Sequence, residues 1–173
     1  METTFLAVAG IHVTRRETGS AMLAARPKRV KVYFELPEEE DGYPPDRVES
    51  LWAEQVGPRE FKIDNIPIFV IGIARGDVVA AYTDEQGELY FKQLLRSSGN
   101  SVFRLYVFDE REVPALRRML RDLGYESEQS YAPSLVAVEI PANRPIHPFL
   151  DLIVKQAKEN HLEYQEATLR QSS

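Results

Sequence analysis

The sequence predicts an α+β protein in which a small bent β-sheet or partial barrel is followed by a ferredoxin-like βαββαβ unit. Short segments in the first half alternate apolar and polar residues between turn residues, as half-buried strands do. Residues 102–169 then show strand and helix patterns in the order β-α-β-β-α-β, which is the arrangement of a ferredoxin-like unit. We therefore divide the chain into a leader at 1–28, a β-rich unit at 29–98 and a ferredoxin-like unit at 99–173.

The β-rich unit begins with a predicted strand at 29–36, where apolar residues alternate with mostly polar ones. Further short strand signals, each bounded by turn residues, follow at 60–63, 69–73, 77–82 and 88–95. Gly87 supplies the positive-φ position of the hairpin turn before the last of these strands. Residues 46–55 are interpreted as the one short helix of this unit. One side of that helix would carry Val48, Leu51 and Trp52.

The ferredoxin-like unit opens with a strand at 102–108 that is apolar on both sides, so both faces of its sheet should be covered. Two amphipathic helices are expected, at 110–123 and from Pro145 to Asn160. The apolar stripe of the first is Val113, Leu116, Leu120 and Leu123. The remaining strands are expected at 125–131, 135–140 and 162–169. Right-handed crossovers place both helices on one face, and the β-rich unit is the expected cover of the other. A second subunit, as in a homodimer, is the alternative cover.

Composition favours a folded protein outside the membrane. The chain has 173 residues, of which 43% are hydrophobic, and it contains no cysteine, so it has no disulfide, thiol nucleophile or thiolate metal site. No apolar run of about eighteen residues predicts a membrane span, and the N-terminus lacks the pattern of a secretory signal. We therefore expect a cytoplasmic location.

Charge is distributed unevenly along the chain. The net charge is −6, yet the first 29 residues carry five basic side chains against two acidic ones. An acidic folded body repels phosphate backbones, so we expect it not to bind nucleic acid. The basic leader is expected to be mobile or loosely attached, with contact to an acidic surface as the alternative.

No pattern in the chain predicts catalysis, a metal site or a cofactor. The three histidines, His12, His147 and His161, lack the spacing of metal ligands, and the motifs HExxH, GxGxxG and GxSxG are absent. RNA-binding relatives of the ferredoxin-like fold stack bases on aromatic residues of two central strands, but residues 135–140 contain none. Residues 103–116 are similar to the opening of amino-acid-sensing ACT domains. Arg111-Glu112 stands where those domains carry their ligand-contacting glycine.

Four short motifs in register resemble an uncharacterised bacterial family, the domain of unknown function 4265. They are Glu49-Ser-Leu-Trp-Ala53, Asp64-Asn-Ile-Pro-Ile-Phe69, Gly76-Asp-Val-Val79 and Ser98-Gly-Asn-Ser101. The resemblance covers about residues 29–170. It implies a stand-alone bacterial cytoplasmic protein and transfers no activity.

The same motifs carry the polar residues from which we expect a binding patch at the junction of the two units. This patch would comprise Trp52, Asp64, Asn65, Asp77, Asn100 and Arg104. The alternative is structural: the Asp and Asn side chains cap turns, and Arg104 pairs with an acid.

Two functional hypotheses follow from these observations. The first is a non-catalytic protein-binding or regulatory module, such as an immunity protein or inhibitor, whose acidic surface attracts a basic toxin or nuclease. The second is an enzyme or small-molecule sensor that uses the junction patch.

Overall fold

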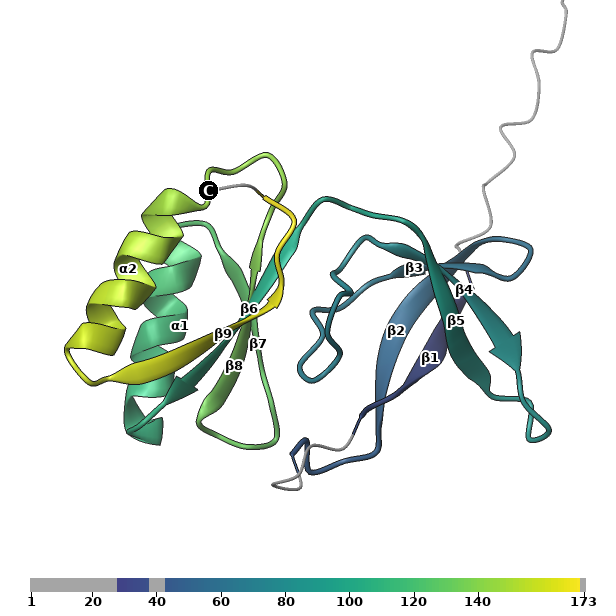
Figure 1. The fold of residues 1–173 in the computed structure, drawn as a ribbon, viewed down its shortest axis with the longest axis horizontal. Coiled ribbons are helices and arrows are strands. Elements are labelled where there is room, and N and C mark those ends of the chain that lie inside the picture. Colours follow the sequence, from purple (N-terminus) through teal and green to yellow (C-terminus); the bar gives the residue numbers. More distant parts are fainter. Residues whose placement is uncertain (1–27, 38–42, 172–173) are drawn as a thin grey trace, which may run out of the picture.

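The computed structural model describes residues 28–37 and 43–171. Within this part, the protein has an α+β fold with nine strands in two sheets and two α-helices. Figure 1 shows the sheets side by side, with both helices on the side of the C-terminal sheet that faces away from the barrel. The predicted leader, apart from Lys28, and residues 38–42 lie outside the described residues.

The N-terminal unit is a closed five-stranded barrel, where the sequence predicted a bent sheet or partial barrel. Its strands are β1 (Arg29–Glu35), β2 (Val48–Gly57), β3 (Glu60–Ile63), β4 (Val78–Thr83) and β5 (Leu89–Arg96). Consecutive strands pair antiparallel, and β1 pairs parallel with β5 through Val32 with Leu89 and Tyr33 with Tyr90. This last pairing closes the barrel and leaves no free edge between its first and last strands.

The short helix predicted at 46–55 is wrong, because this segment is most of strand β2. Every residue of β1 pairs with a residue of β2, and Leu51 and Ala53 alternate into the barrel core while Trp52 points outward. The apolar spacing at 48, 51 and 52 fits a helix turn as well as a strand, and cross-strand pairing along the whole length of β1 decides between them. The predicted strand at 69–73 is also absent. These residues lie in the β3–β4 loop, which runs from 64 to 77.

The β3–β4 loop packs on the face of the C-terminal sheet that carries no helix. Ile66 and Ala74 from this loop form one buried cluster with Val102 and two alanines, Ala137 and Ala167.

The expected cover by the N-terminal unit is thus confirmed for this half of the face. It is wrong for the other half, where Tyr106 and Phe108 are 52% and 45% exposed.

The C-terminal unit follows the predicted β-α-β-β-α-β order. Its strands are β6 (Ser101–Val107), β7 (Glu126–Gln129), β8 (Leu135–Ile140) and β9 (Leu162–Thr168), and they pair antiparallel in the order β7-β8-β6-β9. A 3₁₀ turn (Glu110–Glu112) precedes α1 (Val113–Asp122), and α2 (His147–Lys158) lies beside α1. The core between these helices and the sheet includes the fully buried side chains of Phe103, Leu105, Leu120, Phe149 and Ile153.

Helix α1 begins and ends close to the predicted residues. The Asp109 carboxylate accepts the N–H of Arg111 at the start, and Pro114 occupies the first turn. Gly124, with φ of +80°, turns the chain out of the helix. Leu123, which was predicted on the apolar stripe, is 49% exposed because it lies beyond the last helical turn.

Gly99, in the segment that connects the two units, has less space for a side chain than Gly87 in the β4–β5 hairpin. Both have positive φ, but a Cβ on Gly99 would lie 2.9 Å from Ala142 Cβ, whereas one on Gly87 would meet nothing within 4 Å. Gly87→Ala should lower the free energy of unfolding by about 1–2 kcal/mol through backbone strain alone. Gly99→Ala should cost about 1–3 kcal/mol more, because the added methyl group overpacks the junction. Urea denaturation of both variants checks this order, and equal losses would contradict it.

Candidate binding cleft between the barrel and the sheet

Asp77 is a buried carboxylate that holds the end of the β3–β4 loop. Its Oδ2 accepts the backbone N–H of Ala74 at 3.0 Å, and its Oδ1 accepts that of Ser98 at 2.7 Å. Arg170, which follows β9, donates from Nη2 to the same Oδ2 at 3.2 Å. The side chain is fully buried, so these three donors replace the water that a carboxylate otherwise needs.

Asn100 and Arg104 tie the β3–β4 loop to the C-terminal unit. Asn100 donates from Nδ2 to the Arg75 carbonyl at 3.1 Å and accepts the N–H of Ala142 at 2.9 Å. Arg104 donates from one Nη to Gln165 Oε1 at 2.9 Å and from the other to the Phe69 carbonyl. Both side chains therefore serve the junction between the units.

The other three candidate residues lie on the barrel. Asp64 forms an ion pair with Arg29 at 2.9 Å, and Asn65 Oδ1 accepts the N–H of Trp52 at 2.7 Å. Trp52 is 41% exposed, and its ring lies beneath the cations of Arg29 and Lys31. The structure thus gathers Asp77 and Asn100 at the junction, places Arg104 in a cleft, and leaves this group of three apart. Turn capping, the structural alternative, describes Asp77, which accepts the N–H of Ala74 three residues earlier. Asn65 and Asn100 instead bond backbone groups that are distant in the sequence.

Two further carboxylates that accept hydrogen bonds from the β3–β4 loop were not predicted. The Glu49 carboxylate accepts three successive backbone N–H groups, of Ile68, Phe69 and Val70, at 2.7, 2.8 and 2.7 Å. Glu139, only 2% exposed, accepts two hydrogen bonds from the Arg75 guanidinium. The sequence held a signal for Glu139, which is the one charged residue in the apolar run 135–140, but none for Glu49, whose segment is mixed. A carboxylate in such an apolar run must find donors or remain outside the core.

Arg75 links two carboxylates across the junction. It reaches Glu139 at 2.7 Å and Glu126 at 2.5 Å. Burial by itself would lower the pKa of Arg75, but the hydrogen bonds to the two glutamates outweigh burial and raise it above its ordinary value. Arg75 therefore stays charged, as the buried partner Glu139 requires.

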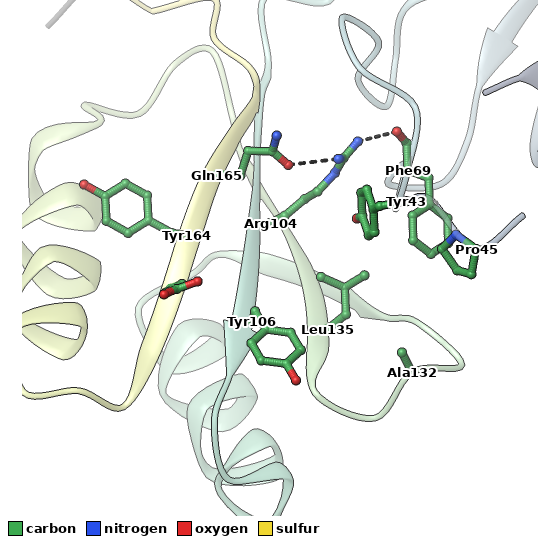
Figure 2. Close-up of a pocket in the computed structure, with 10 residues that line it drawn as sticks. Tyr43, Pro45, Phe69, Arg104, Tyr106, Ala132, Leu135, Tyr164 and Gln165 are labelled. Atoms are coloured by element: carbon green, nitrogen blue, oxygen red, sulfur yellow. Dashed lines mark hydrogen bonds between the residues drawn. The ribbon is translucent and has the colours of Figure 1, made fainter. Parts of the chain in front are cut away.

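Below the loop, the uncovered half of the helix-free face and the barrel enclose a cleft of about 600 Å³. Arg104, Tyr106 and Leu135 line it from the sheet, and Tyr43 and Phe69 line it from the other side (Figure 2). Figure 2 also shows that the Arg104 side chain points across the cleft toward Phe69, while the ring of Tyr164 turns away toward the helices. The cleft thus has largely apolar walls and a polar corner at Arg104 and Gln165.

Two exposed tyrosines lie in and beside this cleft. Tyr106 is half exposed, and Tyr131, whose ring lies 6.2 Å from that of Phe69, is 68% exposed. Tyr131 donates its hydroxyl to Asp46 at 2.8 Å, and this hydrogen bond raises the pKa of Tyr131. Tyr131 therefore remains neutral at physiological pH. The negative charge in the cleft lining comes from the carboxylate of Glu163.

The described part of the chain contains neither a cluster of metal ligands nor a helix that could span a membrane. Within residues 28–37 and 43–171, no three His, Asp or Glu side chains come together as metal ligands would. No helix among the same residues has the length and apolar character needed to cross a bilayer.

The fold and the cleft define an α+β protein in which a closed barrel and a helix-covered sheet border one cleft. The chain belongs to the family described as Domain of unknown function (DUF4265), whose model matches residues 49–164, and the resemblance seen in the motifs is confirmed. No curated protein matches the chain. A solved structure from Neisseria gonorrhoeae, described as a novel crystal structure of a hypothetical protein, is similar in fold. It is 19% identical with a TM-score of 0.61, and the match covers 86% of this chain and 99% of that one.

Proposed function

We propose that this protein is a cytoplasmic, non-catalytic protein-binding module of the inhibitor or immunity type, and that the cleft receives its partner. In this proposal the C-terminal unit is a ferredoxin-like unit, as its element order and the strand order β7-β8-β6-β9 support. The observation that carries the proposal is an open, largely apolar cleft with the exposed rings of Tyr106 in its wall and Tyr131 beside it.

The composition of the cleft supports a protein partner. Exposed apolar surface bordered by polar groups is typical of interaction sites, and tyrosine is enriched among residues that dominate binding energy. The polar side chains of the junction, by contrast, already bond to the protein itself. Asp77, Asn100 and Glu49 each hold backbone groups in place. The exposed rings of Tyr106 and Tyr131 are therefore the groups at the cleft that would bury most apolar surface on contact with a partner.

The charge of the protein supports a basic partner. The chain carries a net charge of −6, and Glu163 and Asp46 place carboxylates in and beside the cleft. Complementary charge steers association and favours a basic protein, such as a basic toxin or nuclease, over an acidic one. The occupant we propose therefore inserts an apolar or aromatic side chain into the cleft, with a lysine or arginine directed at Glu163.

Affinity purification of the full-length protein from its native host tests this proposal. Tyr106→Ala and Glu163→Lys should lose a basic protein that the parent chain retains, and the purified pair should bind in calorimetry. Truncating a central interface tyrosine is expected to cost about 2 kcal/mol, which is roughly a thirtyfold loss of affinity. Tyr82→Ala is the matched control, because this ring is 47% exposed on the barrel exterior. A set of retained proteins that is the same for all variants would refute the cleft as the binding surface.

The size of the cleft favours one second candidate, a small-molecule sensor. About 600 Å³ lies within the range of small-molecule pockets, which often form between domains. A metabolite that raises the melting temperature of the parent protein and of Tyr82→Ala, but not of Tyr106→Ala, would support this candidate. A Tyr106-dependent dimer in sedimentation experiments would instead identify a second copy of the chain as the occupant.

A further inference from the structure

We propose that a groove between α1 and β7 binds the phosphate chain of a small oligophosphate ligand. This groove, of about 470 Å³, is lined by Arg117, Arg118 and Arg121 of α1 and by Ser127 of β7. It lies on the helix side of the sheet, whereas the cleft lies on the other side, so this site is independent of the proposed protein-binding surface.

The first of these arginines is held in place by the neighbouring strand. Arg117 donates from Nε to Ser127 Oγ at 3.1 Å and from Nη2 to the Ser127 carbonyl at 2.9 Å. A third, longer bond runs from Nη1 to Gln129 Oε1 at 3.5 Å. The guanidinium has five N–H donors, so these three bonds fix its orientation and leave two donors for a ligand. A positioned guanidinium loses less conformational entropy on binding than a mobile one.

The three arginines of the groove have no acidic partner among the described residues. No carboxylate in that part of the chain lies within 4.0 Å of Arg117, Arg118 or Arg121. The arginines that do pair with a carboxylate there are Arg29, Arg75, Arg96, Arg111 and Arg170. An acidic protein thus keeps three guanidiniums together without neutralising them.

Two nearby negative groups do not supply the missing charge. Glu126 lines the groove, but its Oε2 lies 2.5 Å from Arg75 Nη1 and is already paired. The C-terminal end of α1 offers the helix dipole, which amounts to only about half an elementary charge. The groove therefore retains a net positive charge, which an anion would offset.

The chemistry of arginine points to phosphate as that anion. The guanidinium presents parallel N–H donors that match two phosphate oxygens, and such charge-assisted bonds are among the strongest in proteins. The groove has the volume of a small-molecule site, and three guanidiniums in one groove suit a ligand with two or more linked phosphates. The Ser127 hydroxyl can add one further hydrogen bond to such a ligand.

Calorimetric titration of the full-length protein with inorganic tripolyphosphate, ATP and adenosine tests this site. Tripolyphosphate and ATP should bind, and adenosine should not. Arg118→Gln/Arg121→Gln should weaken tripolyphosphate binding at least about tenfold, because each lost charged hydrogen bond contributes roughly that factor. Both side chains are exposed, so this variant should keep the melting temperature of the parent.

The matched control removes the same charge from the other helix. Lys155→Gln/Lys158→Gln, in the last turn of α2, should bind tripolyphosphate with the parent affinity. Equal weakening in both double variants would show attraction by overall charge and would overturn the site, as would the absence of binding at about 1 mM tripolyphosphate. ATP binding more tightly than tripolyphosphate would support an oligophosphate that carries a nucleoside, and equal affinities would support recognition of the phosphate chain alone.

Discussion

Asp77→Ala is expected to lower the free energy of unfolding by about 3–5 kcal/mol, because it removes one member of a buried charged network. The substitution leaves the N–H groups of Ala74 and Ser98 without their acceptor in a site closed to water. It also takes the carboxylate partner from Arg170, whose side chain is only 20% exposed. Urea denaturation followed by circular dichroism measures this loss.

The control for this prediction is another aspartate that caps a turn. Asp84 Oδ1 accepts the N–H groups of Gln86 and Glu88 in the β4–β5 hairpin, where water can replace it. Asp84→Ala should therefore cost only about 0.5–2 kcal/mol, as the loss of an exposed cap does. If the two variants lose the same stability, burial is not the reason for the importance of Asp77.

Arg75→Leu should be similarly damaging, and a second substitution should reverse most of the loss. Glu139 is 2% exposed and takes both of its hydrogen bonds in the described structure from Arg75, so the single variant leaves a buried carboxylate without its cation. Breaking a buried ion pair in this way costs about 3–5 kcal/mol.

The reversal distinguishes the cost of an unpaired charge from the loss of packing. Arg75→Leu/Glu139→Leu replaces the pair by apolar side chains, which is often close to neutral or even stabilising for buried pairs. The double variant should thus recover most of the stability that Arg75→Leu loses. A double variant as unstable as the sum of the two single variants would contradict this account and would assign the loss to packing.

The C-terminal unit was predictable because its signals are local. The apolar residues of α1, Pro114 in its first turn and Gly124 after its end all lie within one short stretch of sequence. Strands β8 and β9 are apolar or alternating runs between clear turns. The barrel was harder to predict because its strands are short and their pairing is non-local. The apolar spacing of β2 fits a helix turn equally well, and only its partner β1 decides the outcome.

The positions of three of the six candidate residues were predictable, but the residues that line the cleft mostly were not. Asp77, Asn100 and Arg104 do lie at the junction, as their motifs suggested. The cleft, however, is built from Tyr43 and Phe69 together with residues of the C-terminal sheet, and no short-range pattern relates these segments. Their proximity depends on how the β3–β4 loop docks, which is a property of tertiary packing.

The β3–β4 loop makes the two units depend on each other for stability. It leaves the barrel, yet its Ile66 is buried against the sheet, the N–H of Ile66 is bonded by Glu128, and the Ile73 carbonyl accepts from Thr168. A fragment ending at residue 98 would expose the side chain of Ile66 and would lose the acceptor Glu128 and the donor Thr168. We therefore expect the whole chain to melt in one cooperative step, with closely matched hydrogen-exchange protection in the barrel and the sheet. The boundary between the units divides the architecture of the protein, but it does not divide its folding.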